Sequence, residues 1–128
     1  MMKHNRHLPI WKDAQELLRL LYEGTQKAPR ELRPTLVRRL LDESVELCVH
    51  VDQANRARGS ARVREIIGAQ RAAARIAVLL PIAIDRRCMS LGAGALAVEK
   101  QDAVSRQAHG WRESTLSSSR GAESSVST

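Results

Sequence analysis

The chain has 128 residues, of which 43% are hydrophobic and 2% aromatic, and it carries a formal net charge of +7. This length fits one domain with one core, and few aromatic residues beside many Leu, Val, Ile and Ala favour packed helices over a sandwich of strands. No uninterrupted apolar run approaches the roughly 20 residues that cross a bilayer, and the N-terminal segment shows no secretory signal. We therefore expect a cytoplasmic protein with no membrane partner and with free thiols at Cys48 and Cys88.

The N-terminal half predicts a basic lead-in and two helices. Residues 1–8 are expected to be flexible, and apolar residues then recur every three or four positions from about Pro9 to Thr25, as on one side of a helix. A second helix is predicted from Leu32 to about Asn55, with Pro34 in its first turn, where a missing N–H is tolerated. Its apolar stripe is wide, which predicts the central helix of a bundle. Two i,i+4 pairs are predicted on its wet side, Arg38 with Asp42 and Arg39 with Glu43.

The C-terminal half predicts two further helices and a tail. The third helix is expected from about Ala61 to Arg87, with Ser60 as its N-cap and with either a kink or an interrupted hydrogen bond at Pro81. The fourth, capped by Ser90, should run from about Leu91 to Arg112. Residues 113–128 are rich in Ser and are expected to be a disordered tail. Residues 9–112 would then form an all-α, antiparallel up-and-down four-helix bundle.

Positive charge is concentrated in one segment of the chain. Between Gln53 and Arg87 there are eight arginines against Glu65 and Asp85, a local excess of six positive charges. Arginine suits phosphate because its guanidinium donates two parallel hydrogen bonds. On a helical wheel Arg64, Arg71 and Arg75 share one side with Gly68, and Arg86 joins them if the helix stays straight. The predicted nucleic-acid-binding residues are Arg56, Arg58, Arg62, Arg64, Arg71, Arg75, Arg86 and Arg87.

No set of residues in the sequence predicts catalysis, a metal or a cofactor. The four histidines show no metal-ligand spacing, and the neighbouring acids Asp42, Glu43 and Glu46 have no nucleophile beside them. No zinc-finger, helix-turn-helix or RNP pattern is present. Contact with RNA or DNA is therefore expected through phosphates rather than bases, and Trp111 is expected to be a packing anchor.

Four stretches of the sequence carry a resemblance to a known family. They are WKDAQELLRLLYEGTQKAPRELRPTL, LLDESVELCVHVDQANRAR, RAAARIAVLLPIAIDRRCMS and DAVSRQAHGW. Their order and spacing resemble the four-helix-bundle family that contains the accessory variability determinant (Avd) of diversity-generating retroelements and the proteins encoded in 23S rRNA intervening sequences. The resemblance covers roughly Ile10 to Arg112.

The resemblance implies a fold and a function. It implies a non-catalytic homo-oligomer, a barrel of five subunits, that binds nucleic acid and the retroelement's reverse transcriptase and supports mutagenic copying of a template repeat. A second reading stays open, in which the chain is a structural oligomer of the rRNA-intervening-sequence type whose partner is another protein. Salt-dependent binding to unrelated RNAs and DNAs would separate the two readings.

Overall fold

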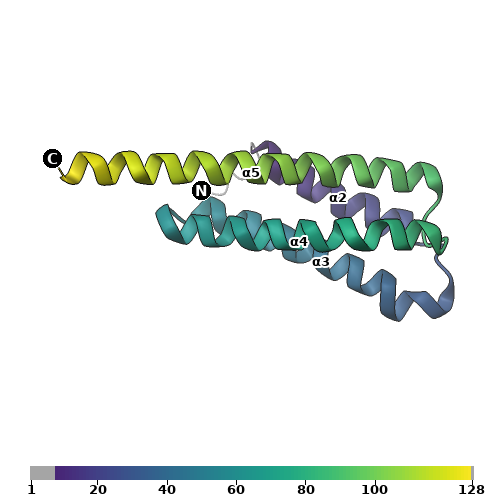
Figure 1. Ribbon diagram of the computed structural model, residues 1–128. Coiled ribbons are helices and arrows are strands. Elements are labelled where there is room, and N and C mark those ends of the chain that lie inside the picture. The colour runs from purple at the N-terminus through teal and green to yellow at the C-terminus, as the bar shows by residue number, and fades with distance from the viewer. Residues whose placement is uncertain (1–7, 128) are drawn as a thin grey trace.

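Four α-helices build the molecule in the computed structural model, which describes residues 8–127, with side chains described as far as Ser119. The helices are α2 (Pro9–Gly24), α3 (Arg38–Arg56), α4 (Gly59–Asp85) and α5 (Leu91–Ser127). Successive helices run in opposite directions (Figure 1). The described part contains no strand, so the prediction of an all-helical, four-helix chain is confirmed. Residues 1–7, expected to be flexible, lie outside the described residues.

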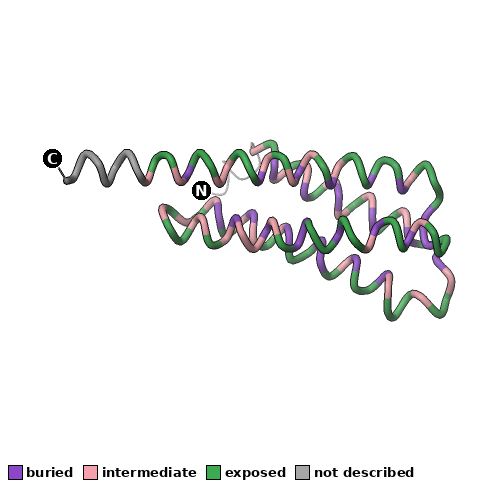
Figure 2. Tube along the Cα trace, viewed as in Figure 1, coloured by how far each residue is buried: buried purple, intermediate pink, exposed green. Residues whose placement is uncertain are grey.

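The core lies along the axis shared by the four helices (Figure 2). α3 packs against α2 and α4, and α5 packs against α2 and α4, so that each helix has two neighbours. The largest side chains that are fully buried include Leu17, Leu21, Leu40, Leu47, Ile66, Ile76, Leu80 and Val104. These are the positions at which the apolar residues recur every three or four residues, and burying them stabilises the bundle.

Two helical turns precede α3, one tighter and one wider than an α-helical turn. A 3₁₀ turn, Arg30–Leu32, is followed by a π turn, Arg33–Val37, and α3 begins only at Arg38. The Arg33 guanidinium donates to the Ala28 and Gln26 carbonyls and holds this corner together. The α-helix that was predicted from Leu32 therefore begins at Arg38, and the 3₁₀ and π turns precede it.

α4 begins two residues before its expected start. Gly59 has a positive φ of 56°, which turns the chain directly into the helix. Ser60 is consequently inside α4 and does not cap it, because the N-cap residue is Arg58. α4 also continues through Pro81. Pro81 lies on the exposed side, where water can satisfy the carbonyl that loses its donor.

α5 begins as predicted but continues beyond its expected end. The Ala93 N–H donates to Ser90 Oγ at 3.1 Å, so Ser90 caps the helix. The helix passes Arg112 and reaches Ser127, so residues 113–127, expected to be a disordered tail, lie in a helix. Within the described side chains, Thr115 gives this extension a buried residue. Its side chain is buried and its Oγ1 donates to the Trp111 carbonyl one turn earlier, so the polar segment still has a packed face.

By length and composition alone, α4 could also cross a membrane. The apolar window that passes this test includes Arg71 and Arg75. The core helix of a soluble protein passes the same test, and α4 contributes seven buried residues to the bundle core. The apolar character of α4 therefore follows from its central place between α3 and α5.

Candidate nucleic-acid interface

Three of the predicted arginines lie on one exposed side of α4. Arg64, Arg71 and Arg75 are all exposed. At about 1.5 Å per residue, Arg71 lies roughly 10 Å along the helix from Arg64 and about 6 Å from Arg75. The spacing predicted from the sequence is thus preserved in the fold, and these side chains form a row beside α3.

Arg64 and Arg71 are available to an external anion. Among the described side chains, neither guanidinium has an ion pair or a hydrogen bond, and the same holds for Arg58 at the α3–α4 turn. Arg64 and Arg56 line one hollow of about 270 Å³ together with Glu65. Arg56 is less available, because its Nε donates to Asp52 Oδ2 at 3.0 Å.

Arg75 shares a carboxylate with Arg39 of α3. Glu43 Oε2 accepts from Arg39 Nε at 3.1 Å, and Glu43 Oε1 lies 3.5 Å from Arg75 Nη1. Glu43 was expected on the wet side of α3 with Arg39 as a local pair. That pair is confirmed, as is the pair of Arg38 with Asp42 at 3.9 Å, but Glu43 itself is buried between the helices. Arg39 therefore belongs to the same basic row as Arg75, although its pairing along α3 hid this in the sequence.

Arg62 is half-buried, and its guanidinium contacts the end of α3 rather than joining the basic surface. Its Nε donates to the Ala54 and Ala57 carbonyls at 3.0 and 2.9 Å, which caps the end of α3. Its guanidinium lies over the Trp111 ring, 5.7 Å from the ring centroid, in a cation–π arrangement. Trp111 packs against the core, as expected of an anchor. The Arg62 guanidinium is thus occupied by the protein itself, and we leave it out of the basic row.

Arg86 and Arg87 lie at the opposite end of α4 from Arg56 and Arg58 (Figure 1). The 27 residues of α4 separate the two groups by about 40 Å. The eight predicted arginines therefore do not form one patch. The row on α4 and its neighbour on α3, namely Arg39, Arg64, Arg71 and Arg75, is the group that the fold brings together, with Arg56 and Arg58 near its end.

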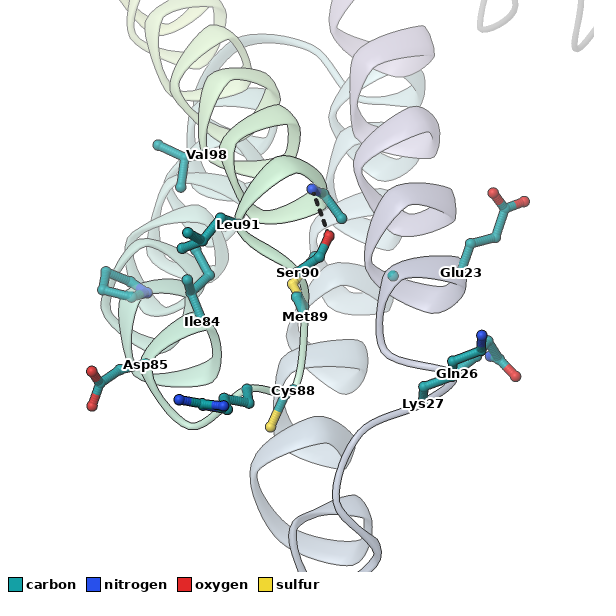
Figure 3. A pocket seen from close by; sticks show the side chains of 14 residues that line it. Glu23, Gln26, Lys27, Ile84, Asp85, Cys88, Met89, Ser90, Leu91 and Val98 are labelled. Atoms are coloured by element: carbon teal, nitrogen blue, oxygen red, sulfur yellow. Dashed lines mark hydrogen bonds between the residues drawn. The ribbon is translucent and has the colours of Figure 1, made fainter.

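A second hollow, of about 1080 Å³, lies at the end of the bundle where α2 and α4 finish and α5 begins (Figure 3). Ile84, Met89, Leu91 and Val98 give it apolar walls, and charged residues including Glu23, Lys27, Asp85 and Arg87 also line it. Cys88 and Ser90 also line it, but burial raises the pKa of the Cys88 thiol, and the Ser90 Oγ accepts the Ala93 N–H at the start of α5. Among the described side chains that line the hollow, no basic side chain or carboxylate is hydrogen-bonded to the side chain of Cys88 or Ser90.

The described residues also show no metal site. They contain no group of three or more His, Cys, Asp and Glu side chains that could hold a metal ion. His50 has a structural role instead, because its Nδ1 lies 2.8 Å from Glu65 Oε1 and so bridges α3 and α4. His109 is exposed on α5, and His4 and His7 lie outside the described residues.

Comparisons of the chain with protein-family models, with curated proteins and with solved structures found no match. The likeness to Avd proteins therefore stays a prediction from the sequence. The functional argument depends on the basic row, whose unpaired guanidiniums and side-by-side arginines suit repeated contact with phosphate groups.

Proposed function

We propose that this chain is a non-catalytic nucleic-acid-binding protein that contacts phosphates through the basic row on α4 and α3. The observation that carries the proposal is that Arg64 and Arg71 are exposed on one side of α4 with unpaired guanidiniums. Unpaired arginines on a rigid helix are ready to replace the counterions condensed on a nucleic acid. By its resemblance to Avd, we propose a retroelement's reverse transcriptase as the protein partner.

We further propose that the protein acts as a homo-oligomer, with the five-subunit ring of the resembling family as the expected form. Exposed apolar side chains support this part of the proposal, because an isolated bundle gains nothing from them. They include Val45 and Val49 on α3 and Ile82 on α4. A monomer mass from light scattering at micromolar concentration would contradict the oligomer.

The same apolar side chains favour one alternative function. In it, the chain is a structural oligomer whose partner is another protein, and the basic row meets an acidic protein surface. This alternative predicts little binding to unrelated RNAs and DNAs, whereas phosphate contact predicts binding to all of them with a steep dependence on salt.

The decisive experiment compares two double variants that remove the same charge. In Arg64→Gln/Arg71→Gln the salt slope of nucleic-acid binding should flatten by about 1.8 on duplex DNA and about 1.4 on single strands, from roughly 0.9 and 0.7 per phosphate contact. The control is Arg19→Gln/Arg106→Gln. These arginines already pair with Glu16 and Glu23 and with Asp102.

The control should leave the salt slope nearly unchanged. Arg38→Gln/Arg39→Gln would be a poor control, because Arg39 shares Glu43 with Arg75. If both double variants bind as tightly as the parent at every salt concentration, the basic row is only a solvated face and the proposed function fails. Inspection of the neighbouring genes for a reverse transcriptase and a repeat pair tests the retroelement assignment separately.

A further inference from the structure

We propose that the groove between Arg39 and Arg75 is a subsite for one unpaired nucleobase, so that the protein prefers single-stranded nucleic acid to duplex. This inference rests on the proposed nucleic-acid binding and adds the kind of strand that is bound.

The groove combines cationic side chains with an aliphatic floor. It has a volume of about 340 Å³ and is lined by Arg39 of α3 and by Ala74, Arg75, Val78 and Leu79 of α4. Val78 is 65% exposed, so the aliphatic floor is open to solvent. The two guanidiniums flank this floor from different helices.

Glu43 positions both guanidiniums. Its side chain is only 11% exposed, whereas those of Arg39 and Arg75 are 60% and 51% exposed. The carboxylate therefore lies beside one nitrogen of each guanidinium, and more than half of each arginine side chain stays exposed to solvent. Oε1 of Glu43 is buried and accepts no hydrogen bond, so its charge is balanced mainly by the two arginines.

This arrangement matches the chemistry of an unpaired nucleotide. Proteins bind splayed bases by stacking them on aromatic rings or on guanidinium planes, and this chain has almost no aromatic residues to offer. An aliphatic floor accepts the apolar face of a base, and Arg71, one turn from Arg75, can contact the adjoining phosphate. In a duplex the bases are stacked inside the helix and cannot enter the groove.

The size of the groove argues against a docked helix as its occupant. An amphipathic helix anchors through residues i, i+4 and i+7, which span about 10.5 Å. The lining residues of α4 run from Ala74 to Leu79, which is about 7.5 Å at the same rise. The groove is therefore long enough for one planar group between two guanidiniums but short for a three-residue anchor.

The test compares a labelled oligouridine with a duplex of equal length at the same salt concentration. Electrostatics alone favours the duplex, whose charge density is higher, so tighter binding of the single strand requires contact with bases. In Arg39→Lys/Arg75→Lys both charges stay and both planar guanidiniums are lost. Single-strand affinity should fall about tenfold, a modest share of what base stacking can contribute, while duplex affinity changes by less than about twofold.

The matched control is Arg64→Lys/Arg71→Lys, which makes the same exchange outside the groove and should preserve the ratio of single-strand to duplex affinity. Circular dichroism verifies that each variant stays helical. If the parent binds neither probe, the proposed function itself fails, and the subsite fails with it.

If the parent binds both probes equally, or if Arg39→Lys/Arg75→Lys keeps the single-strand preference, only the subsite is overturned. If this variant changes the particle mass in light scattering and not the strand preference, the groove is a contact between copies of the chain. That result also overturns the subsite.

Discussion

Gly68 of α4 approaches the imidazole of His50 on α3 so closely that a β-carbon at this position would lie 2.6 Å from the ring atoms Cε1 and Nδ1. The same ring bridges to Glu65 at 2.8 Å. The helical wheel placed Gly68 on the same side of α4 as the arginines of the basic row, and the group that approaches it there is a side chain of the protein itself. The absence of a side chain at Gly68 thus sets how closely α3 and α4 pack beside the basic row.

Replacing this glycine should destabilise the protein despite the better helix propensity of alanine. In Gly68→Ala the gain of about 1 kcal/mol from propensity is opposed by overpacking against His50, which costs about 1–3 kcal/mol. The thermal midpoint should fall. The control is Gly110→Ala on α5, where a β-carbon would meet nothing within 4 Å, and its midpoint should rise. A rise in both variants would show that His50 moves aside freely.

Two positions with positive φ should respond in opposite directions. Arg87 has a φ of 63° where a C-terminal motif after α4 favours glycine, because its own N–H donates to the Ile84 carbonyl and the next N–H donates to the Ala83 carbonyl. Arg87→Gly should therefore raise the free energy of unfolding by about 1 kcal/mol, and Gly59→Ala should lower it by a similar amount. Urea unfolding measures both free energies. If the two variants change the free energy of unfolding in the same direction, the effect of the positive φ angles is contradicted.

Arg62 should matter for stability rather than for binding. Arg62→Gln removes a charged donor to two carbonyls at the end of α3 and the contact with Trp111, so the free energy of unfolding should fall by about 2 kcal/mol. The salt slope of nucleic-acid binding should stay as in the parent. The neighbouring Arg58→Gln is the control and should change stability by less than about 0.5 kcal/mol. If Arg62→Gln is as stable as the parent but has a flattened salt slope of nucleic-acid binding, Arg62 contacts nucleic acid after all.

The thiol of Cys48 should make stability depend on pH in alkaline solution. Burial raises the pKa of Cys48 to about 11. As the pH rises above roughly 8.5, the unfolded chain loses this proton first, so the free energy of unfolding falls until the folded thiol also ionises. Between about pH 7 and about pH 10 the parent should lose roughly 1–2 kcal/mol more than Cys48→Ala. Identical losses in both proteins would mean that the thiol is not desolvated.

The polar end of α5 should contribute measurably to stability. Deleting residues 113–128 removes the buried Thr115 and the half-buried Leu116, so the thermal midpoint should fall by a few degrees, on the scale of about 1 kcal/mol. A chain that ends at Ser119 keeps both residues and should lose less. If the parent and the protein without residues 113–128 have equal thermal midpoints, the segment contributes no packing, as the sequence predicted.

The sequence was sufficient for the helices but not for their ends. Apolar residues at three- and four-residue spacing predicted four helices, and Ser90 was recognisable as a cap. The early start of α4 depends on the positive φ of Gly59, a choice that local residue types leave open. The extension of α5 includes the buried Thr115. The amino-acid composition of this segment does not predict such packing, because serine-rich segments are more often disordered.

The candidate site divides in the same way. Spacing along one helix placed Arg64, Arg71 and Arg75 on one side correctly. It could not show that Arg62 points to carbonyls across a turn, nor that Arg39 and Arg75 meet at Glu43 from different helices. Such relations depend on how helices pack against one another, which the helical period does not encode.

α2 and α5, the first and last helices, lie side by side in the finished bundle. Asp13 lies 3.2 Å from Lys100 Nζ and accepts a hydrogen bond from Gln107 Nε2 at 2.7 Å, across 87 and 94 residues of chain. While the protein is being made, α2 leaves the ribosome long before α5. At about 5–20 residues per second, this side of α2 stays uncovered for roughly 4–19 seconds. Until the last third of the chain has been translated, α3 is the one of its two neighbours in the described bundle that can already cover part of α2.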